Sequence, residues 1–436
     1  MLLQRLSGNR LKYAVWLLVL SALMLGGGVL MAQEGQDGST DAPWAVYLSS
    51  FETLQIQQFN GDGSVVTHQL EPGTENALSG SAAFSPDETK IAYCATPPFS
   101  DDPNATPPPP INRVVVRDLA AGSSLFEAEI GELSACNLTT ESFSLDGSRV
   151  AVGTIPPFPG GPEMPEGEAS WTLYVLDAAS GDTIATLDSL SPELSALGID
   201  TAQTFMMPYV RRVEGDLVTF ALVNWFTEGL PSYDAFVWDT SANTVTEAPL
   251  WGRPFADEIR TADGFEFVYT MLDENQPAAN PGGPMPEANT VVVQREGGEP
   301  VVVYTNTEEI IMSVRYINDG AALAIGLLGA FEMEGDVPVD QPQRFVMLSR
   351  DGTLTDLTEP VVNGSVDVRP VPGGYIHYVR TFNPEDMSTT GTLNANIGGE
   401  ATTLWTDEPG SQGWNLIYAT QPDLSGVSLP EFTPAS

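Results

Sequence analysis

The residue types that usually carry catalysis are scarce in this chain. It contains two histidines, His68 and His377, and two cysteines, Cys94 and Cys136. Nucleophilic hydrolysis needs a hydroxyl or thiol held beside a base, and no Gly-x-Ser-x-Gly motif occurs. No Gly-x-x-x-x-Gly-Lys loop is present to hold a nucleotide phosphate. The sequence therefore predicts no nucleophilic centre, and we expect His377, in an alternating strand, to have a structural role.

The side chains that could take part in binding or catalysis are acidic and aromatic, and they lie in six proline-rich segments. The segments cover 95–112, 155–170, 224–233, 272–288, 328–342 and 381–390. Carboxylates beside exposed rings suit a cationic protein, peptide or glycan. The alternative is that the segments are solvated spacers. The candidate binding residues are Phe99, Asp101, Asp102, Phe158, Glu163, Glu166, Trp225, Phe226, Asp273, Glu274, Phe331, Glu332, Glu334, Asp336, Phe382, Glu385 and Asp386.

The same carboxylates leave two other kinds of chemistry open. Paired acids hydrolyse glycosidic bonds, but spacing alone selects no pair. Oxygen ligands in acidic loops could hold calcium, although the fragment 60–64 (Asn-Gly-Asp-Gly-Ser) lacks the distal glutamate of a calcium loop. Calcium is the only cofactor that the sequence leaves open, and we predict no fixed metal site.

The charge balance excludes several partners. The chain has 17 basic and 58 acidic residues, a net charge of −41. After residue 32, Lys90 is the only lysine. Binding of phosphate backbones requires Lys and Arg to displace counterions. We therefore expect neither nucleic acid nor an anionic membrane surface as a partner.

Residues 1–32 are typical of a secretory signal peptide. Arg5, Arg10 and Lys12 precede an apolar run over 13–32, and small residues near Ala32 suit cleavage. The run is long enough to span a bilayer, so an uncleaved membrane anchor is the alternative. The sequence thus predicts an extracytoplasmic protein, secreted, periplasmic or at the cell surface, with a linker over 33–42.

A strand–turn–strand unit recurs at intervals of roughly 50 residues, which indicates a radial or stacked repeat fold. It reads Phe-Ser-Pro-Asp-Glu-Thr-Lys-Ile-Ala-Tyr over 84–93 and Phe-Ser-Leu-Asp-Gly-Ser-Arg-Val-Ala-Val over 143–152. Weaker copies cover 210–220, 259–269, 316–325 and 368–378.

A second hairpin signal, built on Gly, Asn or Asp turns, alternates with the first unit. Together the two units make four antiparallel strands, as in a propeller blade. The sequence therefore predicts an all-β, seven-bladed β-propeller over 43–420. The seven hairpins cover 54–66, 114–125, 173–184, 236–245, 291–302, 345–354 and 393–403.

The first blade lacks its innermost strand. Residues 44–47 supply its second strand, and a spare strand over 413–420 has no sheet of its own. We predict that the spare strand completes the first blade and closes the ring, leaving 421–436 as a C-terminal tail. Cys94 and Cys136 stand about one unit apart, so a disulfide between neighbouring blades is predicted; two buried thiols are the alternative.

The first copy of the repeat resembles the Phe-Ser-Pro-Asp-Gly motif of TolB-type and WD-repeat-like bacterial propellers. The resemblance covers two units well and the others loosely. It implies a propeller in which Phe84 and Phe143 pack between blades while Asp87 and Asp146 shape turns, and it implies no activity. The chain departs from the motif at Glu88, where glycine is expected.

These observations predict an exported, non-enzymatic propeller that binds a partner. In a blade, the connections between the second and third strands leave the ring on one face, so the six acidic segments share a rim. Binding sites on rigid β scaffolds are often formed by such loops. The alternative is a glycan-active hydrolase or lyase that uses carboxylates at the mouth of the central channel.

Overall fold

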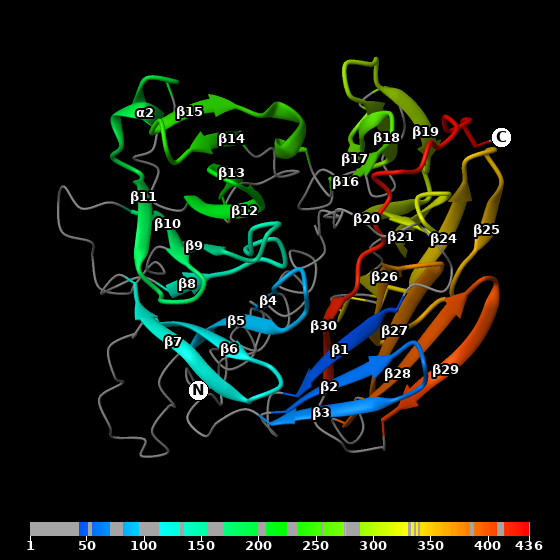
Figure 1. Cartoon of the computed structure of the whole chain (residues 1–436). Coiled ribbons are helices and arrows are strands. Elements are labelled where there is room, and N and C mark those ends of the chain that lie inside the picture. The colour runs from blue at the N-terminus through cyan, green and yellow to red at the C-terminus, as the bar shows by residue number, and fades with distance from the viewer. Residues whose placement is uncertain are drawn as a thin grey trace, which may run out of the picture.

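The chain forms a ring of seven four-stranded antiparallel sheets, shown in Figure 1. This confirms the predicted seven-bladed β-propeller. The computed structural model describes residues 43–50, 55–69, 82–95, 113–130, 135–155, 170–198, 206–224, 234–253, 256–273, 275, 288–329, 333–334, 337–338, 341–383, 388–407 and 414–435.

The first three blades are described from the innermost strand outward. Blade I comprises β30 (Trp414–Ala419), β1 (Ala45–Ser50), β2 (Gln55–Asn60) and β3 (Val65–Gln69). Blade II comprises β4 (Ala82–Phe84), β5 (Lys90–Ala95), β6 (Arg113–Asp118) and β7 (Ser123–Glu129). Blade III comprises β8 (Ala135–Asn137), β9 (Arg149–Ile155), β10 (Thr172–Asp177) and β11 (Thr183–Asp188).

Blades IV to VII repeat this order. Blade IV comprises β12 (Met206–Glu214), β13 (Leu217–Asn224), β14 (Asp234–Asp239) and β15 (Thr244–Glu247). Blade V comprises β16 (Asp257–Thr261), β17 (Gly264–Met271), β18 (Thr290–Arg295) and β19 (Val301–Thr305). Blade VI comprises β20 (Glu309–Ile317), β21 (Ala322–Gly329), β24 (Gln343–Ser349) and β25 (Leu354–Asp356). Blade VII comprises β26 (Gly364–Val371), β27 (Gly374–Asn383), β28 (Ser388–Ile397) and β29 (Glu400–Thr406).

Two sides of the ring follow from this order. The tight turns between first and second strands, and between third and fourth strands, lie on what we call the turn side. The connections between second and third strands, and from blade to blade, begin and end on the loop side. In the described residues the remaining elements are a small hairpin of β22 (Met333–Glu334) and β23 (Val337–Pro338) and the helical turns α2 (Pro192–Ser195) and η1 (Pro249–Gly252).

The repeat residues have the structural roles that the resemblance implied. The Asp87 carboxylate accepts hydrogen bonds from the Ser85 hydroxyl (2.6 Å) and the Thr89 hydroxyl (2.8 Å), which fixes the turn. Phe84 packs between blades I and II, with its ring centroid 4.7 Å from that of Tyr418 and 4.5 Å from that of Tyr47. Inter-blade packing of this kind makes up most of the core.

The predicted disulfide is present. Cys94 on β5 and Cys136 on β8 are joined, with their Cα atoms 5.7 Å apart. The bridge links the second strand of blade II to the innermost strand of blade III. A cross-link over a sequence separation of 42 residues stabilises a fold by about 4 kcal/mol in the chain-entropy model.

Ring closure also follows the prediction, because β30 pairs antiparallel with β1. Val46 lies opposite Ala419 and Ser50 opposite Trp414. At the end of the pair, the Ala45 amide donates to the Thr420 hydroxyl oxygen over 2.8 Å, and the Thr420 amide donates to the Ala45 carbonyl over 2.9 Å. The two ends of the propeller are therefore held within one sheet.

The contacts of Glu88 explain why the chain departs from the repeat motif at this position. It occupies the left-handed turn position, with φ of 56°, that Gly147 occupies with φ of 67° in the next blade. A non-glycine residue there costs free energy. The Glu88 carboxylate accepts hydrogen bonds from the Tyr47 hydroxyl (2.9 Å) and from the Thr420 hydroxyl. Blade II is thereby bonded to β1 and to the residue that follows β30.

The segment after β30 packs across the turn side, from blade I to blades V and VI; Figure 1 shows it in red running to the C-terminus. Leu424 and Phe432 are buried in the core of those two blades. Arg350 lies over the Phe432 ring at 4.2 Å, and its Nη2 bonds the buried Glu266 carboxylate over 2.7 Å. We refer to residues 421–435 as the strap.

We predict that closure and strap contribute separately to stability. A chain ending at Pro409 loses β30, so the whole ring should melt at a lower temperature in a single transition. A chain ending at Gln421 keeps β30 but exposes the cores of blades V and VI, so its melting temperature should fall by a smaller amount. Calorimetry distinguishes the three chains, and an unchanged melting curve for the shorter chain would contradict closure.

Candidate functional site

A cluster of buried charged side chains lies at the centre of the ring, and we call it the axial cluster. Its members belong to five successive blades and come from the innermost strands or the turn beside them. All are almost fully buried. They are Glu141 of blade III, Arg211 of blade IV, Asp257 of blade V, Arg315 of blade VI and Arg369 of blade VII.

Electrostatic interactions between blades that are not neighbours indicate that these groups lie near one another at the axis. Glu141 of blade III interacts with Arg369 of blade VII and also influences Arg315 of blade VI. Tyr209 interacts with the same glutamate and with all three arginines. Only the centre of a seven-bladed ring brings such distant blades together.

An irregularity in blade III supplies Glu141. The strand pairs Asn137 with Gly153 and then Phe143 with Val150, so six residues advance on one strand against three on the other. The side chains of Asn137 and Thr139 donate to the carbonyls of Pro208 (3.2 Å) and Val210 (2.9 Å) in blade IV. The extra residues are thereby fixed, and Glu141 is carried to the axis.

A β-bulge supplies Arg211. On β12, Val210 pairs with Phe220 and Arg212 with Thr219, which leaves Arg211 without a cross-strand partner. Consecutive residues of a regular strand point to opposite faces, and a bulge redirects one of them. Both arginines are consequently buried: Arg211 lies over the Tyr209 ring at 4.8 Å, while Arg212 reaches Glu258 of blade V at 3.3 Å.

Burial shifts the acids of the axial cluster toward their neutral forms. It raises the pKa of Asp257 to about 7, although the Tyr316 amide donates to its carboxylate over 3.0 Å and Arg315 attracts its charge. Burial also raises the pKa of Glu141, against the opposing effects of the Thr140 hydroxyl and of Arg211. Burial lowers the pKa of Arg315 to about 10, so it remains charged at neutral pH.

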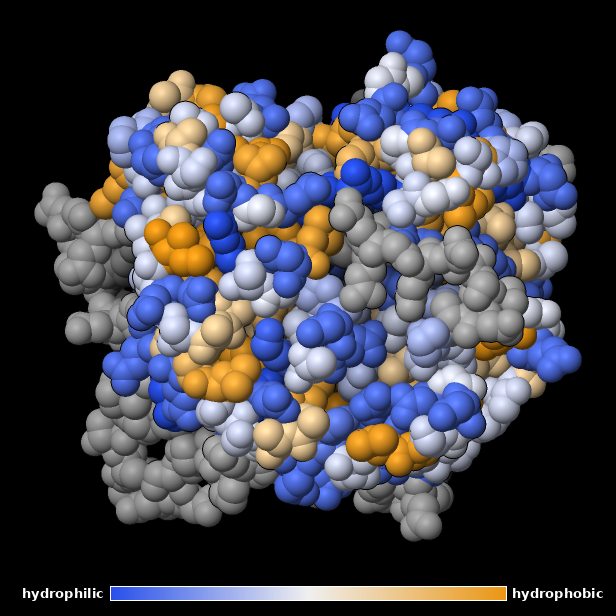
Figure 2. Space-filling view, viewed as in Figure 1, coloured by the Kyte–Doolittle hydropathy of each residue, from blue (hydrophilic) through white to orange (hydrophobic). Residues whose placement is uncertain are grey.

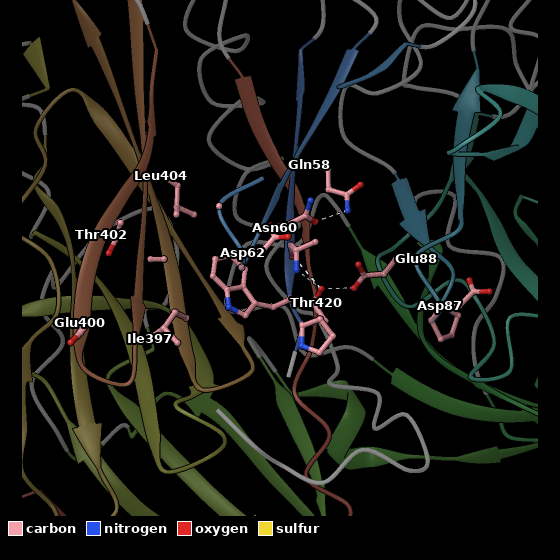
Figure 3. Close-up of a pocket in the computed structure, with 17 residues that line it drawn as sticks. Gln58, Asn60, Asp62, Asp87, Glu88, Ile397, Glu400, Thr402, Leu404 and Thr420 are labelled. Carbon is pink, nitrogen blue, oxygen red and sulfur yellow. Dashed lines mark hydrogen bonds between the residues drawn. The ribbon is translucent and has the colours of Figure 1, made fainter. Parts of the chain in front are cut away.

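A hollow of about 1220 Å³ lies on the turn side beside the ring closure. Figure 3 shows Glu88 and Thr420 joined across it, with Asn60 and Asp62 close by. Four of its lining residues are acidic and none of them is basic, so it disfavours anions. The acidic lining residues are Asp62, Asp87, Glu88 and Glu400.

Few of the predicted loop residues fall within the described part of the chain. Asp273, after β17, has its amide bonded to the Asn289 side chain (2.8 Å) and its carboxylate bonded by the Asn275 amide (2.9 Å). Phe382, on β27, is exposed. Glu334 lies on β22. Outside the described residues lie Phe99, Asp101, Asp102, Phe158, Glu163, Glu166, Trp225, Phe226, Glu274, Phe331, Glu332, Asp336, Glu385 and Asp386.

Both histidines have structural positions. His68 on β3 bonds the Leu119 carbonyl of blade II (2.9 Å) and the Gln58 side chain (2.8 Å), and so joins two blades. His377 on β27 lies 3.1 Å from the Asn394 amide, and burial lowers its pKa. Neither histidine adjoins a serine or cysteine in these contacts.

Two further observations concern the described residues only. They contain no group of three or more His, Cys, Asp or Glu side chains arranged to hold a metal ion. The calcium expectation therefore stays a prediction for the acidic connections. None of the helices among them has the length and apolarity needed to cross a membrane.

Sequence reasoning missed the axial cluster, although a signal was present. Val-Arg recurs shortly before the turn in the innermost strands of blades IV, VI and VII, at 210–211, 314–315 and 368–369. In a chain with so few basic residues this recurrence is informative. The similar Ile-Arg at 259–260 lies one residue from its turn, and Arg260 is exposed.

We predict that the fold is more stable in mild acid than above neutrality. The pKa of Asp257 is higher in the folded state (about 7) than the ordinary 3.8. Its stabilising contribution is therefore complete below pH 4 and is lost as pH rises through 7. Between pH 5 and 8 the unfolding free energy should fall by on the order of 2 kcal/mol. Glu141 and Glu258, whose pKa values burial also raises, act in the same direction.

Urea denaturation of Asp257→Asn at constant ionic strength provides the check, since the variant should have a shallower slope over this pH range. Asp239→Asn is the matched control. Hydrogen bonds from the Ala242 amide and the Ser241 hydroxyl lower the pKa of Asp239. Its contribution to the unfolding free energy therefore changes only in more acidic solutions. Equal slopes for the parent and Asp257→Asn would refute the assignment.

Comparisons with known proteins give structural similarity only. No family model matches the chain, and no curated protein matches it. Similar solved structures include the β-propeller domain of the Trilobed protease from Pyrococcus furiosus (14% identity, TM-score 0.42, covering 83% of this chain and 96% of that one). Prolyl oligopeptidase B from Galerina marginata is another (13%, 0.49, 90% and 53%).

TolB from Acinetobacter baumannii is also among these structures, with 15% identity and a TM-score of 0.34, covering 72% of this chain and 63% of that one. The chain spans about half the length of the acylaminoacyl peptidase and prolyl oligopeptidase chains that it matches. By its own strand pairing, the chain is a seven-bladed β-propeller closed between its first and last strands.

Proposed function

We propose that this protein is a binding propeller that captures a cationic partner on the loop side of its ring. One observation carries the proposal. The strand order places both ends of all seven connections between second and third strands on that side. Each of these connections contains an acidic residue, and none contains lysine, arginine or histidine.

The connections from blade to blade reinforce this asymmetry. They share the loop side, and Arg253 is the only basic residue in them. The other basic residues after residue 42 lie in strands or in tight turns of the opposite side. A surface with one sign of charge raises the local concentration and the association rate of oppositely charged partners.

The surface that the described residues present agrees with recognition led by charge. Figure 2 shows hydrophobic residues in separate patches among polar ones. Large exposed apolar side chains such as Leu125, Ile184 and Leu354 are spaced out on the outer strands of different blades. Scattered apolar residues of this kind need no partner to cover them.

The Cys94–Cys136 disulfide bears on where such binding takes place. Structural disulfides persist in oxidising compartments, so we place the binding role outside the cytoplasm. A signal peptide or membrane anchor over 1–32 stays a prediction from the sequence, since these residues lie outside the described part.

We predict that the combined substitutions Glu332→Gln, Glu334→Gln and Asp336→Asn slow association with a lysine-rich peptide about threefold at low salt. The reason is that they weaken the summed electrostatic field of the acidic loop side. Biolayer interferometry with the full chain measures the rate. The matched control Asp351→Asn changes a carboxylate in an exposed turn-side hairpin and should leave the rate unchanged. Charge attraction is screened strongly at about 0.5 M salt and weakly at about 20 mM salt. Equal binding at the two salt concentrations would therefore contradict the proposal.

The axial cluster favours a second candidate, a glycan-active hydrolase or lyase. Glu141 and Asp257 are carboxyl groups with raised pKa values on one axis, and glycoside hydrolysis uses a protonated acid beside a second carboxylate. Release of reducing ends from acidic or neutral polysaccharides, abolished in Asp257→Asn, would establish this candidate over simple binding. Capture of intact polysaccharide without turnover would favour the first.

A further inference from the structure

Two arginines of the axial cluster are buried and have no hydrogen-bond acceptor among the described residues. Arg211 is 5% exposed and Arg315 is 4% exposed. Among the described residues, none accepts a hydrogen bond from either guanidinium group, and no carboxylate lies within 4 Å of them. Arg211 lies over the Tyr209 ring and interacts electrostatically with Glu141, and its Nε is enclosed and unbonded.

Such an arrangement is unfavourable unless something else supplies acceptors. A guanidinium group has five N–H donors in a fixed planar fork. Burying a charged group without hydrogen bonds costs several kcal/mol. Two other buried arginines are paired with carboxylates: Arg350 bonds Glu266 and Arg212 bonds Glu258. Arg211 and Arg315 have no such carboxylate partner among the described residues.

Two neighbouring acids, Asp257 and Asp367, accept hydrogen bonds from other groups. The two oxygens of Asp257 accept from the Glu258 amide (2.9 Å) and the Tyr316 amide (3.0 Å). Asp367 accepts from Arg369 Nε over 3.0 Å. Burial raises the pKa of Asp257 to about 7 and also raises the pKa of Glu141, which weakens the negative charge beside Arg315.

We propose that Arg211 and Arg315 form a binding site on the propeller axis for an oxyanion, a carboxylate or phosphate group of a ligand. Planar forks match these groups with paired N–H···O bonds. Arg369, although it bonds Asp367, adds positive charge from blade VII. The site is distinct from the acidic loop side, and it does not depend on the cationic partner proposed above.

The site has an expected signature in both affinity and stability. Succinate or inorganic phosphate should bind the full chain with one site in calorimetry and raise the melting temperature, whereas chloride at the same ionic strength should not. Comparison of succinate with phosphate decides between the two oxyanion classes. The Gln variants at Arg211 and Arg315 should each weaken binding at least tenfold, and Arg315→Lys should weaken it less, because it keeps the charge without the fork.

Stability without ligand separates this proposal from a structural role. An arginine that holds the fold through an ion pair destabilises it when removed. Removal of a buried, unpartnered guanidinium group should instead leave the melting temperature of Arg315→Gln equal to or above that of the parent. Arg260→Gln, on the innermost strand of blade V but exposed, is the matched control and should change neither binding nor stability.

Three results would overturn the proposal. The first is that neither oxyanion raises the melting temperature more than chloride. The second is that the Gln variants bind the oxyanion as tightly as the parent, which would place the site elsewhere. The third is that Arg315→Gln unfolds at a lower temperature than the parent. The amide variants of Glu332, Glu334 and Asp336 should retain oxyanion binding, so failure of the loop-side proposal is recognised separately.

Discussion

The structure depends on the pairing of β30 with β1. The ring of seven sheets is closed here by backbone hydrogen bonds between strands from opposite ends of the propeller. Glu88 of the neighbouring blade adds a side-chain hydrogen bond to this closure, although its own φ is unfavourable. The closed ring in turn fixes the positions of the innermost strands. Charged groups from five blades can meet on the axis because none of those strands can move outward alone.

Several of the few basic residues are buried and connect parts of the structure. Six arginines of the described part of the chain are buried, namely Arg117, Arg211, Arg212, Arg315, Arg350 and Arg369. Arg212 and Arg350 connect blades to one another or to the strap. Five acidic residues of the described part are buried with them, namely Glu141, Asp257, Glu258, Glu266 and Asp407. Side chains of both signs therefore meet inside the ring, and most of the excess negative charge lies on its outer surface.

The repeat pattern predicted the architecture well because each blade is a local object. Apolar alternation and Gly, Asn or Asp turns define the hairpins within about twelve residues, and the missing first strand with a spare last strand defined the closure. The axial cluster was not predicted, because it depends on departures from the repeat. Glu141 reaches the axis through extra residues in blade III, and Arg211 through a bulge. Neither irregularity has a sequence signature comparable to a turn. The packing of the strap does not follow from the sequence, since Leu424 and Phe432 show no periodicity from which packing could be inferred.

The position of β30 in the chain has a consequence for how this protein is made. Blade I cannot be completed until residues 414–419 have been synthesised, and the strap that seals blades V and VI comes later still. Blades II to VII can form as the chain emerges, since their strands are contiguous in sequence, but their ring stays open until then. During that interval the second strand of blade I presents an unpaired edge, the kind of surface that templates association with other chains. Late closure thus makes the nascent chain a natural client for factors that shield strand edges.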